Sequence, residues 1–178
     1  LVKRIIGASV AELTEGEIVA SSQGVRVISG TVLWGNTAVG PYAYLGRYHQ
    51  GVALLEEGTK NEFFLKNWMG LGIHRHSATR AFLANFIHPS TYTFNTALNG
   101  GPRSIMPIGC YEKVLAPYGV EATMLVRAID INDTDQAKLL GILEFSEEDI
   151  ALATYVCPGK NDFGPLLRRS LTKIEVEG

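Results

Sequence analysis

The sequence predicts an α+β protein, in which a small mixed sheet that carries one helix is followed by a small C-terminal helical bundle. Residues 1 to about 104 are rich in glycine, β-branched and aromatic residues, in short runs that end at turn residues. From about Pro107 onward, apolar residues recur at helical spacing behind residues that cap helices. The change of pattern separates a sheet-forming part from a helix-forming part.

Strands are expected in four runs of the first part: "KRIIG", "VRVISG", "TVLWG" and "GVALLEEG". Each run has the length of a strand and ends in glycine. Between the first two runs lies "ASVAELTEG", in which Ser9 is placed to cap a single helical turn. Val10 and Leu13 form the apolar side of that turn, and Gly16 ends it.

Two helices are expected early in the second part, in "EATMLVRAI" and in "TDQAKLLGILEF". The second of these begins with Thr134 as its cap. Each segment spaces its apolar residues so that one side of a helix is buried. These residues are Met124, Leu125 and Ala128 in the first segment, and Ala137, Leu140 and Leu143 in the second.

Two further helices are expected towards the end of the chain. In "SEEDIALATYVC", Ser146 is a cap, and the three acidic residues that follow it suit the positive end of the helix dipole. Pro158 and Gly159 end this helix. In "GPLLRRSLTKIEVEG", Pro165 stands in the first turn. Its apolar stripe consists of Leu167, Leu171 and Ile174.

Composition and charge exclude two classes of function. The net charge of −2 provides no basic face for nucleic acid. The longest uncharged runs, 27–46 and 81–102, are interrupted by glycine, proline and asparagine, so neither predicts a membrane-spanning helix. The chain starts at Leu1 without a methionine, and we expect it to be part of a longer protein.

The two cysteines, Cys110 and Cys157, are too few for an iron–sulfur cluster or a structural zinc site, and no C-x-x-C pair occurs. Cys157 precedes Pro158, as many cluster ligands do, but we expect both thiols to be small buried apolar groups.

Other cofactor motifs fail on spacing. "GLGIHR" has Arg75 where a dinucleotide-binding loop needs its third glycine. "DINDTDQ" does not continue as a calcium loop, so Asp133 and Asp135 are interpreted as the start of a helix. His74 and His76 would share one side of a strand, but a metal site would also need His49 or His88. We therefore expect no metal site.

The segment "GPYAYLGRYHQG" is the candidate for contact with a partner protein. It supplies Tyr44, Arg47, Tyr48 and His49 between two glycines, with Tyr42 beside them. Tyrosine and arginine are enriched at protein interfaces. The alternative is that these rings cover the sheet within the chain.

Longer tracts resemble a known family. They are "GASVAELTEGE", "RVISGTVL", "YLGRYH", "FNTALNGG", "PIGCYEKV", "NDTDQA", "LGILEFSEEDIALATYVCPGK" and "GPLLRRSLTKIEVEG". Together they resemble the C-terminal part of the NqrA family, which supplies one subunit of the sodium-translocating NADH:quinone reductases (Na⁺-NQR). The resemblance covers nearly the whole chain, which makes it more specific than any short motif.

The resemblance implies a place in a six-subunit complex of the bacterial inner membrane, which passes electrons from NADH to ubiquinone and pumps Na⁺. That complex uses NAD, flavins and iron–sulfur chemistry, whereas the NqrA subunit is peripheral, lies on the cytoplasmic side and carries no flavin or cluster. The implied partners are the other subunits, with the membrane subunit NqrB foremost. No catalytic, cofactor-binding or metal-binding residue is carried over from the family.

The resemblance also implies an arrangement of domains. Relatives in other respiratory complexes place a soluble-ligand-binding β-grasp (SLBB-like) domain before a helical domain that holds cluster cysteines. The corresponding parts here are a β-grasp domain over residues 1–60, an extension over 61–104 and a helical domain over 105–178. Two functions stay open: structure and docking in the complex, or a module that binds a small quinone-type ligand.

Overall fold

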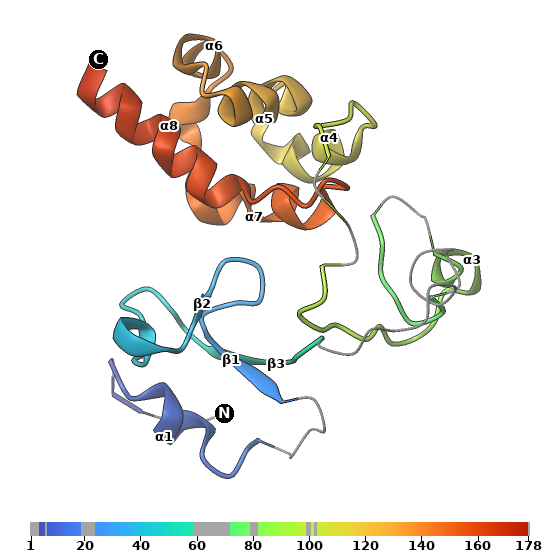
Figure 1. Cartoon of the computed structure of the whole chain (residues 1–178), viewed down its shortest axis with the longest axis vertical. Coiled ribbons are helices and arrows are strands. Elements are labelled where there is room, and N and C mark those ends of the chain that lie inside the picture. Colours follow the sequence, from blue (N-terminus) through green and yellow to red (C-terminus); the bar gives the residue numbers. More distant parts are fainter. Residues whose placement is uncertain are drawn as a thin grey trace. The chain divides into compact units, whose positions relative to one another are not determined.

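The computed structural model describes residues 4–5, 7–18, 24–58, 72–78, 82–98, 101 and 103–177. The chain divides into two compact units (Figure 1). The first comprises Leu1–His76 with Phe82–Ala97, and the second comprises Ser77–Ala81 with Leu98–Gly178. The expected extension lies partly in 59–71, outside the described residues, so the three-part division stays a prediction.

A sheet with the order β2-β1-β3 forms the centre of the first unit within the described residues. Its strands are β1 (Val25–Ser29), β2 (Asn36–Thr37) and β3 (Val52–Glu56). Both pairings are antiparallel, with Val27 opposite Leu54 and Ile28 opposite Thr37. The described parallel pairing is an isolated bridge from Glu56 to Asn95. The mixed sheet expected from the sequence is therefore not found among the described strands.

The expected strands "VRVISG" and "GVALLEEG" are confirmed, but the strand expected at "TVLWG" is wrong. Residues 31–35 form a turn, in which the Gly35 amide donates to the Thr31 carbonyl oxygen at 2.8 Å. A Cβ atom on Gly35 would lie 2.5 Å from Cγ2 of Ile28, so only glycine permits this close approach. The β-branched and aromatic residues of this run indicated a strand, but the turn leads back into β2.

The short helix α1 (Val10–Thr14) lies where the sequence placed it. Ser9 stands at the N-cap position, but its side chain makes no capping hydrogen bond, so the expected cap is wrong in that respect. Gly16 follows the helix with a φ of 78°, which glycine adopts without strain. Val10 is buried, and Leu13 is half-buried. At the expected strand "KRIIG", the described residues 4–5 have no strand conformation, and the other positions of that run include residues outside the described ranges.

An ion pair connects β1, β3 and the later segment of the first unit, which contains α3 (Ala84–Ile87). Arg26 donates to both carboxylate oxygens of Glu57, at 2.8 and 3.0 Å. The Thr96 hydroxyl also donates to Glu57 at 2.6 Å. These hydrogen bonds, that from Arg26 foremost, hold the pKa of Glu57 below its usual value. Residues near 96 are thereby attached to the sheet.

The second unit is built of helices (Figure 1). These helices enclose one apolar core. Its described helices are α4 (Cys110–Leu115), α5 (Ala122–Ile131), α6 (Thr134–Leu139), α7 (Glu147–Val156) and α8 (Phe163–Glu177), with 3-10 turns at Ala116–Tyr118 and Ile142–Glu144. A further 3-10 turn, Gly40–Tyr42, belongs to the first unit. Fully buried side chains of the core include Tyr111, Leu115, Leu125, Ile129, Ile142, Ile150, Phe163 and Leu167.

The start of α7 follows the predicted capping pattern. The Asp149 carboxylate accepts hydrogen bonds from the amide and the hydroxyl of Ser146, at 2.8 and 2.6 Å. The prediction for α6 needs a correction, because the cap is Asp133 rather than Thr134. The Asp133 carboxylate accepts from the Gln136 amide at 3.0 Å, which confirms the helix-start interpretation of the acidic cluster.

Two apolar positions expected in the core of the second unit are exposed. Met124 lies on the outer side of α5, while Leu125 and Ala128 beside it are buried. Leu143 is exposed because α6 ends at Leu139 and the chain turns at Gly141, which has a φ of 89°. Ile142 takes the buried place instead. The stripe on α8 is confirmed, since Leu167 is buried and Leu171 and Ile174 pack against the core.

Candidate functional site

The candidate contact segment, residues 40–51, is fixed to the sheet through the buried Ser29 at the end of β1. The Ser29 hydroxyl lies 2.8 Å from Nδ1 of His49 and accepts a hydrogen bond from the Gly46 amide at 3.2 Å. The Gly30 amide also donates to the Gly51 carbonyl oxygen at 2.9 Å. Because β1 is paired on both sides, the segment rests on a rigid support.

His49 is an internal residue of this segment. Its ring is half-buried and meets Trp34 edge-to-face, with 5.1 Å between the ring centroids. Gly46 passes so close that a Cβ atom there would lie 2.7 Å from Nδ1 of His49. His49 therefore holds the segment in place, whereas its expected contact with a partner stays a prediction. The sequence analysis did not identify Ser29 and Trp34 as supports of this segment. The glycines around the segment were the available signal that its backbone packs closely against other residues.

The aromatic side chains of the segment point away from the core. Tyr42 is 55% exposed, Tyr44 60% and Tyr48 81%. Arg47 is exposed as well, and it forms no ion pair within the described part of the chain. We call Tyr42, Tyr44, Arg47 and Tyr48 the tyrosine surface. These rings leave most of their area open rather than covering the sheet, and their role in partner contact stays a prediction.

The four histidines have separate local contacts. Nδ1 of His74 lies 3.4 Å from the Thr91 carbonyl oxygen, and His76 meets the Tyr92 ring edge-to-face. Nδ1 of His88 lies 3.2 Å from the Phe86 carbonyl oxygen. Across the described ranges, no group of three or more histidine, cysteine or acidic side chains is placed to hold a metal ion.

Both cysteines lie in the apolar core of the second unit. Cys157 ends α7 and is fully buried, and its sulfur accepts a hydrogen bond from the Tyr111 hydroxyl at 3.2 Å. Burial, with a smaller effect from this hydrogen bond, raises the pKa of Tyr111. Burial likewise raises the pKa of the Cys110 thiol, which keeps it protonated. This environment is that of a packing residue rather than of a nucleophile.

Known proteins match this chain over both units. A family model described as "NQRA C-terminal domain" matches residues 1–40. The NqrA subunit of the Na(+)-translocating NADH-quinone reductase is 48% identical over all 178 residues in both Histophilus somni (strain 2336) and Vibrio alginolyticus. The protein of the same name from Shewanella frigidimarina (strain NCIMB 400) is 50% identical over the same span.

The resemblance to NqrA is confirmed. The chain is similar to the C-terminal part of NqrA and spans 39% of the length of these curated relatives. The aligned span is the entire chain of 178 residues. In the ranges that the structure describes, no helix has the length and apolar character required to cross a bilayer.

Proposed function

We propose that this chain serves as the peripheral, C-terminal part of the NqrA subunit in a sodium-pumping NADH:ubiquinone reductase, and that it contributes structure and docking rather than redox chemistry. The observation that carries this proposal is the 48% identity over the whole chain to proteins named as that subunit of the enzyme. The complex as a whole passes electrons from NADH to ubiquinone and moves Na⁺ across the bacterial inner membrane. The proposed place of this subunit is the cytoplasmic side of that membrane.

The tyrosine surface is the proposed site of docking to the other subunits, foremost the membrane subunit NqrB. Exposed tyrosines next to an exposed arginine can bury a large area in an interface at a low cost in side-chain entropy. The support through Ser29 and His49 reduces that cost further, because the segment is ordered before a partner arrives. We also propose that the first unit is a β-grasp (SLBB-like) domain and the second a helical bundle. The alternative of a quinone-type ligand module has no support from the relatives, and we do not propose it.

A chimera tests the proposed membership of the complex. Residues 1–178 would replace the matching part of NqrA from Vibrio alginolyticus, with the same part of the Neisseria meningitidis protein as the matched control. We expect both chimeras to assemble with the other subunits and to support NADH-dependent quinone reduction close to that of the parent. If the control assembles while a folded chimera of this chain does not, the proposal is wrong.

We further expect the purified 178-residue chain to carry no flavin, cluster or stoichiometric metal. The reason is that its two cysteines lie in an apolar core and that the described histidines have separate partners. Visible absorption spectra and elemental analysis after purification measure this directly. A flavin or cluster absorption band, or iron or zinc close to one atom per chain, would contradict the cofactor-free role.

A further inference from the structure

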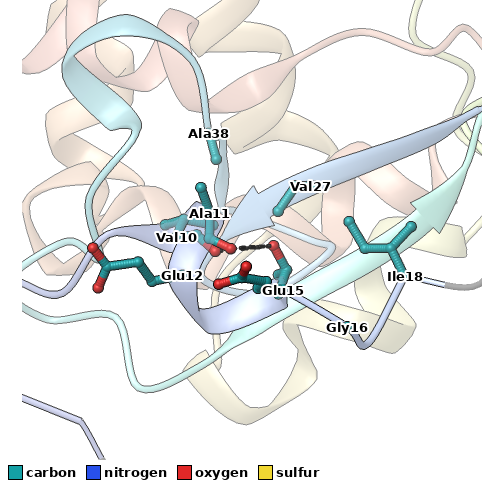
Figure 2. A pocket seen from close by; sticks show the side chains of 9 residues that line it. Val10, Ala11, Glu12, Glu15, Gly16, Ile18, Val27 and Ala38 are labelled. Atoms are coloured by element: carbon teal, nitrogen blue, oxygen red, sulfur yellow. Dashed lines mark hydrogen bonds between the residues drawn. The ribbon is translucent and has the colours of Figure 1, made fainter.

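A hollow of about 650 Å³ lies beside α1 in the first unit (Figure 2). This size falls within the range of ligand-binding pockets, which is roughly 300 to 1,000 Å³. Its apolar lining comes from Val10, Ala11, Ile18, Val27 and Ala38. The hollow shares no residue with the tyrosine surface, so it is a second place at which a partner could be bound.

Thr14 is a polar residue of the lining whose hydroxyl is already hydrogen-bonded within α1. Val10 and Thr14 are the buried residues of this helix. The Thr14 hydroxyl donates to the Val10 carbonyl oxygen at 3.0 Å, as the dashed line in Figure 2 shows, so it is satisfied within the helix. Ala11 and Ile18 are exposed although they line the hollow. The apolar part of the lining is thus open to solvent chiefly at Ala11 and Ile18, while Val27 and Ala38 are half-buried.

Carboxylates border this apolar lining. Glu12 and Glu15 line the hollow. Figure 2 shows the Glu12 carboxylate at one side of the lining residues and Ile18 at the opposite side. Both acidic residues are exposed, and their carboxylates have no hydrogen-bond or ion-pair partner in the described ranges. Along the sequence, the basic residues nearest to them are Arg4 and Arg26. The hollow therefore combines apolar contact with two carboxylates that form no ion pair in the described ranges.

We propose that the hollow binds a basic amphipathic segment of a partner protein. Aliphatic or aromatic side chains of that segment fill the space between α1 and β1, and its lysine or arginine side chains pair with Glu12 and Glu15. Charge complementarity selects this occupant, since an uncharged ring would leave both carboxylates without a counter-charge. This inference goes beyond the proposed docking through the tyrosine surface and does not depend on it.

Titration calorimetry of the 178-residue chain with a short helical peptide of leucine and lysine tests this inference. We expect measurable binding that weakens with added salt, and no binding of a peptide with serine in place of leucine. Glu12→Lys with Glu15→Lys should weaken binding about tenfold or more. The matched control is Glu144→Lys with Glu175→Lys, which makes the same change in net charge at exposed positions of the second unit and should keep full affinity.

A second variant tests the apolar part without changing charge. Ala11→Phe places a ring in the hollow from an exposed position of α1 and should weaken binding by a similar factor. Circular dichroism establishes that each variant is folded. If the two lysine double variants lose affinity equally, the attraction depends on net charge alone, and the inference is overturned. Undiminished binding to the Ala11→Phe variant, or no binding to the unaltered chain, would overturn it as well.

Discussion

Replacement of Phe163 by alanine is expected to destabilise the helical unit by about 3 to 5 kcal/mol, which is the usual cost of removing a fully buried ring. Phe163 begins α8, is fully buried and meets the Tyr111 ring edge-to-face at 5.9 Å. Its amide also donates to the Thr154 hydroxyl at 3.0 Å, which ties the start of α8 to α7. The cavity left by the ring would therefore lie at the contact between α7 and α8 and would weaken the packing of both helices.

Cys157→Ala in the same core should cost only on the order of 1 kcal/mol. It removes one sulfur atom and the hydrogen-bond acceptor of Tyr111, but no ring. Urea unfolding followed by helical circular dichroism measures both variants. Leu139→Ala, at a side chain that is 89% exposed, is the control and should change stability by less than about 0.5 kcal/mol.

The comparison of the two core variants also tests the role of the thiol. In the chimeric complex, Cys157→Ala should leave quinone reduction near normal, because the buried sulfur packs in the apolar core and accepts hydrogen bonds from Tyr111 and Asn161. A large loss of turnover in a variant that folds and assembles would show that the thiol takes part in chemistry. A stability loss as large as that of Phe163→Ala would instead contradict the small cost expected for the loss of one buried sulfur atom.

Helices whose determinants lie within a few residues could be predicted from the sequence. The start of α7 is fixed by hydrogen bonds between Ser146 and Asp149. Its end is fixed by the proline that follows Cys157. The cap of α6 was misplaced by one residue, because Asp133 and Thr134 are both good caps and only the backbone decides between them. Such errors concern boundaries rather than the existence of a helix.

The sheet region was harder to predict because its determinants lie far apart in the sequence. The run "TVLWG" has strand-like composition, yet Gly35 packs against Ile28 and closes a turn. The tyrosines that the sequence offered as contact residues are exposed, and their contact with a partner stays a prediction. The support of these tyrosines could not be predicted, because Ser29 reaches Gly46 and His49 across 17 and 20 residues, and no local pattern indicates such contacts.

The double variant Tyr44→Ala with Arg47→Ala is expected to weaken the retention of the NqrA subunit in the chimeric complex by about 2 kcal/mol or more. This corresponds to roughly a thirtyfold rise in the dissociation constant. Both side chains are exposed in the chain alone, so their removal leaves no cavity. The melting temperature of the isolated chain should therefore stay within a few degrees of its original value.

The control for this experiment removes a similar pair from the helical unit, through Ile131→Ala with Arg127→Ala. Ile131 is 70% exposed, and Arg127 is an exposed arginine that forms no ion pair in the described part of the chain. Retention is measured from the amount of NqrA that stays with the complex on dilution, beside thermal melting of each isolated variant.

If the tyrosine surface docks, only the first pair reduces retention, and it does so without an earlier melt. If these side chains stabilise the fold instead, the first variant melts several degrees earlier and loses retention only as far as unfolding explains. Equal retention of the two variants would place the docking contact elsewhere on the chain.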